Sequence, residues 1–356
     1  MAVSPTGVFV TQETDALFHY HFNKCNLLNS IQVYNDLDQF RDSNHTHKIA
    51  CLQMPYPVRA EFDTLLDDLA ACSDQVLILM SELHDRTVEI VQRHDDPQIS
   101  YFICGTFNFE LTNSPVHKFY DWFTTTVHFY KYVRPNTLDV LDPYAAKPHV
   151  VDALLGRKKL HRDYAFDRLS SMTNNLYTYL GDISCNFDDP AKWVWEREGV
   201  DIDQPVEWTV DRVPYYGHRM SISQIVPLSI YNQTAYTLVA ETNYSNHYSF
   251  YTEKTVKPIL ARRLFVMLGG QHQLQNLRSI GFKTFDGIVD ETYDTVADSG
   301  QRFKQAMDQI EYLHSQPQEE ILTKIKPICE HNYNHMMSTD WYDVYFKSAF
   351  VEYFNQ

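Results

Sequence analysis

SFYTEKTVKPILARRLFVMLGG, residues 249–270, is the stretch around which this chain is organised. Aromatic residues lead to Thr252, which can cap a helix, and an apolar run at 264–268 then closes on two glycines. That order predicts a turn, a short helix, a buried strand and a loop. A helix start suits phosphate, because free N–H groups and the positive end of the helix dipole point at the anion, and Lys254 adds a full charge. The stretch is therefore a candidate diphosphate site.

Pro258 leaves two placements for this helix. Proline cannot donate to the carbonyl four residues back, so the helix either begins at Thr252 and is kinked, or restarts near Pro258 and leaves Glu253 and Lys254 in a turn. Both placements put Lys254 near a helix start. Adjacent helical residues point about 100° apart, so Glu253 and Lys254 would touch different parts of one ligand. The competing interpretation is an exposed Glu-Lys pair on a surface helix.

Length and composition favour two domains. The chain has 356 residues, 44% of them hydrophobic, enough for two cores. No apolar run reaches the roughly 18 residues of a membrane span, and the N-terminus lacks the basic and apolar regions of a secretory signal. The six cysteines are scattered without close pairs or metal spacing, which is typical of reduced thiols. We therefore expect a cytoplasmic protein.

The charge of the chain is unevenly distributed. Its formal net charge is −16, from 46 acidic and 30 basic residues, which disfavours general nucleic-acid binding, although a local basic groove could survive. The basic residues gather in two groups: Arg157, Lys158, Lys159, His161, Arg162 and Arg168, and Lys254, Lys257, Arg262 and Arg263. Basic islands in an acidic protein suit a small anionic ligand better than a long strand of nucleic acid. Two solvated helix faces are the alternative.

The first half alternates strands with helices. Its pattern predicts strands at 8–11, 31–34, 48–53, 75–80 and 99–105, and helices at 59–71 and 86–93. Such alternation implies a mostly parallel sheet covered on both faces, with ligands beyond the carboxyl ends of the strands. Residues 75–80 run straight into Glu82 and His84, and residues 99–105 lead to Glu110, so these side chains are expected at that edge.

The second half repeats the alternation. Residues 117–132 are aromatic-rich and predict a packed helix or helix pair, whose rings suit a core better than a sugar platform. Prolines then interrupt the pattern in residues 135–150, where we place a domain boundary. Further strands are predicted at 150–155, 176–179, 236–240 and 264–268, and helices at 162–172, 273–280, 301–313, 319–325 and 341–354. The fold class is α/β, with domains at 1–145 and 146–335 and a C-terminal helix at 336–356.

The residues after the strand at 236–240 resemble a known donor-binding signature. Ala240-Glu241-Thr242-Asn243, followed by Tyr251-Thr252-Glu253-Lys254, looks like that of the α1,3-fucosyltransferase family, in which a strand ending in Glu-Asn-Ser precedes Tyr-x-Thr-Glu-Lys. An upstream arginine after a short strand completes the family pattern, and Arg162 matches it here. Thr242 and Asn243 replace the family's Asn and Ser, and Pro258 and Arg263 fall where that family usually differs.

A wider pattern resembles uncharacterised glycosyltransferase-like proteins of bacteriophages. It comprises Leu154-Leu155-Gly156-Arg157 with His161-Arg162, and residues 277–282 with Thr284-Phe285-Asp286. If a phage encodes the chain, we expect the protein in the cytoplasm of the host cell.

The fucosyltransferase resemblance implies two Rossmann-like domains in a GT-B arrangement, with the nucleotide sugar in the C-terminal domain and the acceptor in the N-terminal one. Its donor-binding residues would be Arg162, Glu241, Asn243, Tyr251, Thr252, Glu253 and Lys254. Arg162 and Lys254 would stabilise charge on the leaving diphosphate, and Glu241 and Glu253 would accept hydrogen bonds from ribose or sugar hydroxyls. The implied reaction is an inverting transfer to a glycan or other hydroxyl acceptor, with no cofactor and no metal.

An inverting transfer also needs a base that takes the proton of the acceptor hydroxyl. Glu82 is the first candidate, because it follows a buried strand and would face the cleft between domains; His84 is second and Glu110 third. The competing interpretation of Glu82 is a carboxylate that caps the next helix.

Metal sites and other functions compete with this hypothesis. Asp201-Ile202-Asp203 matches the metal-binding Asp-x-Asp motif but follows no predicted buried strand. The pairs His19/His21 and His45/His47 would suit a metal only on a strand with a third ligand. Two other functions remain open: sugar transfer to modified DNA bases, which the acidic balance disfavours, and a non-catalytic or virion-associated binding protein that keeps a nucleotide fold.

Overall fold

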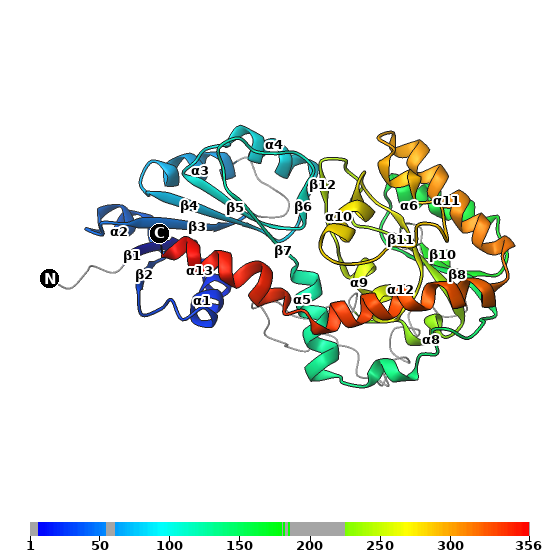
Figure 1. The fold of residues 1–356 in the computed structure, drawn as a ribbon. Coiled ribbons are helices and arrows are strands. Elements are labelled where there is room, and N and C mark those ends of the chain that lie inside the picture. The colour runs from blue at the N-terminus through cyan, green and yellow to red at the C-terminus, as the bar shows by residue number, and fades with distance from the viewer. Residues whose placement is uncertain (1–5, 55–60, 180, 182–183, 186–224, 356) are drawn as a thin grey trace. The chain divides into compact units, whose positions relative to one another are not determined.

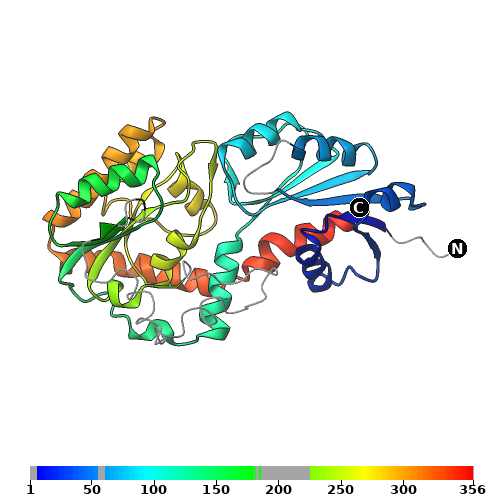
Figure 2. The ribbon, with the colours of Figure 1, turned by 180° about the vertical axis from the view of Figure 1, so that it is seen from behind.

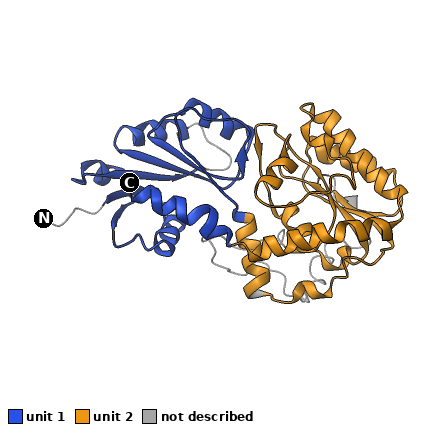
Figure 3. Ribbon diagram, in the orientation of Figure 1, with its two compact units in different colours: residues 1–121, 214–218, 340–356 blue, residues 122–213, 219–339 orange. Residues whose placement is uncertain are grey.

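The chain forms two compact units (Figure 3). The computed structural model describes residues 6–54, 61–179, 181, 184–185 and 225–355, so the Asp201-Ile202-Asp203 motif lies outside the described residues. Of the described residues, 6–121 and 340–355 form unit 1, and the others form unit 2. The division falls after Asp121, whereas the sequence pattern suggested 135–150. None of the described helices is long and apolar enough to cross a membrane.

Unit 1 is built on a parallel sheet of six strands in the order β2-β1-β3-β4-β5-β7. The strands are β1 (Thr6–Val10), β2 (Ile31–Tyr34), β3 (Lys48–Gln53), β4 (Gln75–Met80), β5 (Ile99–Cys104) and β7 (Val116–Phe119); the short β6 (Thr106–Phe107) lies outside this sheet. Every residue of β5 is buried, as expected for a central strand covered on both faces.

Helices cover both faces of this sheet. They are α1 (Asp15–Lys24), α2 (Leu37–Asp42), α3 (Glu61–Ala70), α4 (Asp85–Arg93), the π-helical η5 (Asp343–Lys347) and α13 (Ser348–Phe354). Helices α3 and α4 lie on one face, and α1 and α13 on the other (Figures 1 and 2). Phe350 of α13 contacts the rings of Phe22 in α1 and Phe102 in β5. The C-terminal segment therefore completes the core of unit 1.

Unit 2 is built on a second sheet, in the order β10-β9-β8-β11-β13. Its strands are β8 (His149–Leu155), β9 (Asn175–Tyr179), β10 (Ser184–Cys185), β11 (Thr234–Ala240) and β13 (Phe265–Leu268), all parallel except β10. The helical elements are α5 (Asp121–His128), η1 (Phe129–Val133), η2 (Thr137–Val140), α6 (Leu160–Ser170), α8 (Leu228–Tyr231), α9 (Glu253–Leu260), α10 (Gln273–Ser279), η4 (Thr292–Thr295), α11 (Ser299–Ser315) and α12 (Gln318–Ser338); a short strand, β12, covers Tyr248–Ser249.

The predicted fold class, α/β with two Rossmann-like domains, is confirmed by these two sheets. Two local predictions need correction. The aromatic segment 117–132 starts inside strand β7, not in a helix, and only then continues as α5 and η1. Helix α12 does not stop near Ile325 but runs through Pro327, because Ile325, Cys329 and Met336 continue its buried face and outweigh the lost hydrogen bond.

The carboxyl edge of the second sheet is tightly packed. Gly269 and Gly270 follow strand β13, and the loop after β11 passes directly against Gly270. A Cβ added to Gly270 would lie 2.0 Å from the carbonyl oxygen of Ser245, so only glycine allows this approach. The loop that follows β11 is thereby held close to the sheet edge.

Candidate functional site

Three cationic side chains, two from the start of α6 and one from α9, converge on residues 241–243 at the end of β11. Lys159, which precedes α6, donates from Nζ to the carbonyl oxygen of Thr242 (2.5 Å) and to Asn243 Oδ1 (2.9 Å). Lys254 in α9 donates to Thr242 Oγ1 (3.3 Å), and Arg162 in α6 donates to the carbonyl oxygen of Glu241 (3.1 Å). We call Lys159, Arg162 and Lys254 the cation cluster.

Arg162 is buried yet retains hydrogen-bonding capacity. Its Nη1 donates to the carbonyl oxygen of Arg157 (3.0 Å), and its Nη2 is on Glu241, but its Nε is buried and has no partner among the described residues. A Cβ added to Gly156 would lie 3.2 Å from Nη1, so glycine makes room for the guanidinium group. Burial lowers the pKa of Arg162, but arginine stays protonated at neutral pH.

The carboxylate of Glu241 is fully buried and turned toward α9. Its Oε1 accepts from the backbone N–H of Thr252 (3.1 Å) and the hydroxyl of Thr255 (2.5 Å). Its Oε2 accepts from the backbone N–H of Thr242 (3.0 Å) and the hydroxyl of Thr252 (2.7 Å). Through these four bonds Glu241 holds the start of α9 against the end of β11. Its predicted contact with ribose or sugar hydroxyls stays a prediction.

Helix α9 begins at the first of its two predicted positions. Thr252 is its N-cap, the helix runs from Glu253 to Leu260, and Pro258 lies inside it. The Thr252 side chain accepts from the N–H of Lys254, and Glu241 accepts from the N–H of Thr252. The expected free N–H groups at this helix start are thus largely occupied. At the start of α6, Lys159 is the N-cap residue and makes no side-chain capping bond, so α6 is the helix start better suited to an anion.

Glu253 and Lys254 form a partly buried ion pair, not the exposed surface pair of the alternative interpretation. Lys254 Nζ lies 2.5 Å from Glu253 Oε1, and 19% of the lysine side chain is exposed. Burial acts to raise the pKa of Glu253, but Lys254 and Lys257 outweigh it and hold that pKa below its usual value. Glu253 therefore stays ionised and orients Lys254.

His161, a residue missing from the predicted site, sits at the centre of this arrangement. It is fully buried in the first turn of α6, and its Nε2 lies 2.7 Å from the carbonyl oxygen of Glu241. Burial, followed by the charge of Arg162, lowers the pKa of His161 to about 3. The imidazole is therefore neutral, donates from Nε2, and adds no further charge to the cation cluster. Two signals in the sequence included it, the basic run at 157–162 and the pattern shared with bacteriophage proteins, but neither indicated this role.

The depressed pKa predicts how stability changes with pH. The unfolded His161 titrates near 6.5 and the folded one near 3, so the unfolded chain binds the extra proton between these values. The stabilisation is present above about pH 6.5 and is lost as pH falls. Relative to His161→Gln, whose amide can donate the same bond, the wild type should lose about 2 kcal/mol of unfolding free energy between about pH 6.5 and pH 5. Urea unfolding of both proteins between about pH 6.5 and pH 5 measures the difference. The same change of unfolding free energy with pH in both proteins would contradict the prediction.

The remaining predicted site residues are placed as follows. Asn243 accepts from Lys159 and belongs to the same cluster, whereas Tyr251 is buried and its hydroxyl donates to the carbonyl oxygen of Gln273 (2.6 Å). Glu82 and Glu110 are exposed, and both belong to unit 1.

His84, the second candidate base, occupies the N-cap position of α4 without a capping side-chain bond. Glu82 and His84 follow β4 at its carboxyl end, as the sequence suggested. Their proposed role as bases stays a prediction.

Several basic residues of the two sequence groups lie outside the cluster. Arg168 pairs with Glu311 of α11, and Arg262 pairs with Glu330 of α12 and lies over the ring of Tyr333. Arg263 is buried against Asp152, on the far side of a short turn from α9. Proximity in sequence therefore overstated the number of cations at the site.

No group of three or more His, Cys, Asp or Glu side chains in the described part of the chain lies in a metal-binding arrangement. Of the histidines singled out in the sequence, His21 is buried against Tyr342, Phe346 and Phe350. His45 contacts the hydroxyl of Tyr34 (2.8 Å).

The chain matches no protein-family model and no curated protein. Among solved structures it is similar to an α1,3-fucosyltransferase, with a TM-score of 0.42 and 10% identity over 96% of this chain and 92% of the other. It is also similar to an α1,3-fucosyltransferase with GDP-fucose, with a TM-score of 0.35 and 11% identity over 100% of this chain and 91% of the other. Neither structure is that of a bacteriophage protein by its description.

Proposed function

We propose that this protein is a GT-B glycosyltransferase that transfers a sugar from a nucleotide-sugar donor to a hydroxyl group of a glycan or another acceptor. The observation that carries the proposal is the convergence of Lys159, Arg162 and Lys254 on residues 241–243. Glu241 and Glu253 are the carboxylates that act on Arg162, and Glu253 also pairs with Lys254, so two acidic side chains face three cations among the described residues. This balance leaves positive charge for a ligand. The site lies beyond the carboxyl end of a parallel sheet, where α/β proteins bind nucleotides.

The cation cluster would act on the departing diphosphate. In the transfer, the bond between the anomeric carbon and the phosphate oxygen breaks and its electron pair stays on the diphosphate, while the acceptor oxygen forms the new bond. Fixed cations that face this growing charge lower the barrier, and removal of one such group typically costs ~3 kcal/mol, or ~100-fold or more in rate. The start of α6 adds its dipole to the same anion.

The other half of the reaction needs a proton acceptor. Glu82 in unit 1 remains our first candidate, with His84 second, because both follow a buried strand at its carboxyl end. We expect the transfer to invert the configuration at the anomeric carbon. The positive charges of the lysine and arginine side chains would stabilise the leaving diphosphate, as a divalent ion does in other transferases. Turnover is accordingly expected to survive EDTA.

Ligand-induced thermal stabilisation tests the donor site. GDP, UDP, CDP and dTDP and their sugars are added singly, and a ligand at roughly 100 times its dissociation constant should stabilise the protein by ~2.7 kcal/mol. Lys254→Ala and Arg162→Ala should erase the response, because each removes a charge from the site. Lys304→Ala is the matched control, since Lys304 is exposed in the same unit and pairs with Asp308.

The outcomes separate the possible functions. Stabilisation by one nucleoside diphosphate or its sugar that is lost in Lys254→Ala supports the donor site. Release of that nucleoside diphosphate from its sugar in the presence of an acceptor supports transfer. Binding without any turnover would favour a non-catalytic protein. No response to any nucleotide, or a response that Lys254→Ala retains, would overturn the proposal. Circular dichroism spectra verify that the Arg162→Ala variant is folded.

A further inference from the structure

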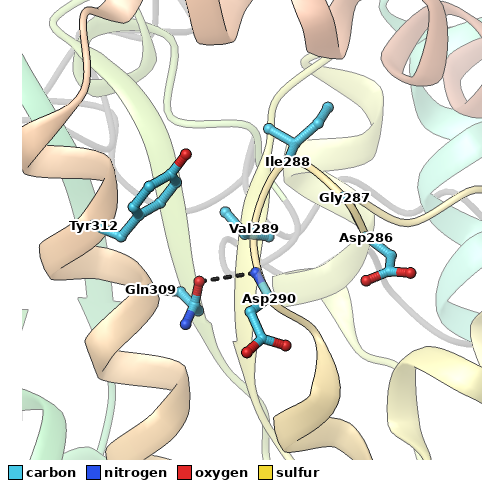
Figure 4. A pocket seen from close by; sticks show the side chains of 7 residues that line it. All are labelled: Asp286, Gly287, Ile288, Val289, Asp290, Gln309 and Tyr312. Carbon is cyan, nitrogen blue, oxygen red and sulfur yellow. Dashed lines mark hydrogen bonds between the residues drawn. The ribbon is translucent and has the colours of Figure 1, made fainter.

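A hollow in unit 2 shares no residue with the cation cluster (Figure 4). It has a volume of about 430 Å³ and lies between the turn at 286–290 and helix α11, which contributes Gln309 and Tyr312. The turn contributes Asp286 and Asp290. Since the lining includes no lysine or arginine, the hollow is unsuited to the phosphate groups expected at the cation cluster.

The polar groups that line the hollow can both donate and accept. Gln309 Oε1 accepts from the backbone N–H of Asp290 (2.9 Å), which fixes the amide and leaves its NH₂ group to donate. Within the described residues, no group donates to the Asp286 carboxylate, and none bonds the Tyr312 hydroxyl. Hydrogen bonds from the hydroxyl and N–H of Thr292 hold the pKa of Asp290 below its usual value, so that side chain is an ionised acceptor.

An aromatic ring forms one wall. Tyr312 is 38% exposed, one of few large hydrophobic side chains with so much exposure in the described chain. Its ring and the half-buried Ile288 supply apolar surface beside the carboxylates. An aromatic face next to carboxylate acceptors and a fixed amide donor matches a sugar ring, which has one apolar C–H face and a rim of hydroxyl groups.

The turn is held in shape before any ligand arrives. The N–H groups of Ile288 and Val289 both donate to the carbonyl oxygen of Phe285. The buried carboxylate of Glu291 accepts from the N–H of Phe285 (2.7 Å) below the turn. Gly287 has φ +81°, and an added Cβ would meet no atom within 4 Å, so the mouth of the hollow is open. A preorganised, open site loses little entropy when it binds a small ligand.

We propose that this hollow is a binding site for a neutral saccharide of one or two sugar rings. The ring of Tyr312 would stack on the C–H face of the sugar, Asp286 and Asp290 would accept from its hydroxyl groups, and the Gln309 amide would donate to one of its oxygens. The two carboxylates would exclude acidic sugars. The site does not depend on the proposed transfer reaction, because it can bind a saccharide with no donor present.

Saccharide titrations monitored by NMR test this proposal on the full chain. Glucose, galactose, mannose, N-acetylglucosamine, cellobiose, maltose and lactose are the neutral probes, and glucuronate is the acidic one. At least one neutral probe should bind with a dissociation constant of about 1 mM or below, as expected for a shallow site. Tyr312→Ala and Asp286→Ala should each weaken it by about tenfold or more. Both side chains are exposed, so the variants should fold.

Two controls make the test specific. Tyr132→Ala removes another tyrosine of the same unit, 65% exposed, and should leave saccharide binding unchanged. Lys254→Ala should also leave it unchanged, so a failed donor site and a failed saccharide site give separate results. Absence of binding by every neutral probe, equal binding in Tyr312→Ala, or tighter binding of glucuronate than of glucose would each overturn the proposal.

Discussion

Replacement of Arg263 by methionine is expected to lower the free energy of unfolding of unit 2 by about 3 to 5 kcal/mol, the usual cost when one partner of a buried ion pair is removed. Arg263 and Asp152 are both buried, with Nη2 and Oδ2 2.7 Å apart. The other guanidinium N–H groups donate to a ring of oxygens from Tyr231, Thr234, Tyr236 and Thr237. The variant would leave these oxygens without the arginine donor. It would also leave the Asp152 carboxylate, which still accepts from the hydroxyls of Thr234 and Thr237, buried without its counterion.

Urea unfolding, followed by circular dichroism, measures this loss. Burial raises the pKa of Asp152 while Arg263 lowers it, so the carboxylate without its partner should take up a proton or destabilise the fold. A second change, Asp152→Leu in the Arg263→Met protein, should recover part of the loss, because an apolar pair leaves no buried charge. Lys304→Ala removes an exposed ion pair of the same unit and should leave the unfolding midpoint unchanged. Equal midpoints for Arg263→Met and Lys304→Ala would contradict the prediction.

Arg263 also shows why a basic run in sequence is a poor guide to a charged surface. Arg263 and Lys254 fall in the same sequence group, but Arg263 comes after α9 has ended and two residues before β13 begins. Between them Arg262 adopts φ +54°, which reverses the chain direction. One cation therefore joins the site and the other enters the core.

The strands were predictable because burial on both faces leaves a short continuous apolar run. Gln75–Met80 and Lys48–Gln53 were placed to the residue for this reason. Helix α12 was not, because its continuation past Pro327 depends on tertiary contacts of its buried face, which local propensity does not report.

The candidate site was predictable in part. Lys254 was expected from the helix start that follows Thr252, and Arg162 from the resemblance to the fucosyltransferase signature. In the structure both donate to residues 241–242. The inward turn of Glu241 depends on threonines at 252 and 255 that lie one helical turn apart and meet the strand end only after folding. The hollow beside Tyr312 was not predictable, since it joins a turn and a helix that share no sequence motif.

Glu241→Gln is expected to destabilise unit 2 by about 3 kcal/mol and to weaken nucleotide binding, although the two side chains have the same shape. Each oxygen of Glu241 accepts from one backbone N–H, that of Thr252 or that of Thr242. A glutamine must place its NH₂ group against one of them, so a buried donor faces another donor whichever way the amide is turned. Loss of a bond to a charged group costs about 1.5 to 3 kcal/mol, and an unsatisfied buried N–H adds to it.

The same substitution separates two uses of Glu241. If the carboxylate serves α9, hydrogen exchange should speed up at the amides of Thr252 and Lys254 in Glu241→Gln, and Thr255→Ser, which keeps its hydroxyl donor, should behave nearly as the wild type. If the carboxylate instead contacts the ligand, the variant should lose nucleotide binding while those amides stay protected. The four internal hydrogen bonds lead us to expect the first result: the position of Lys254 depends on Glu241, and binding weakens because the helix start moves.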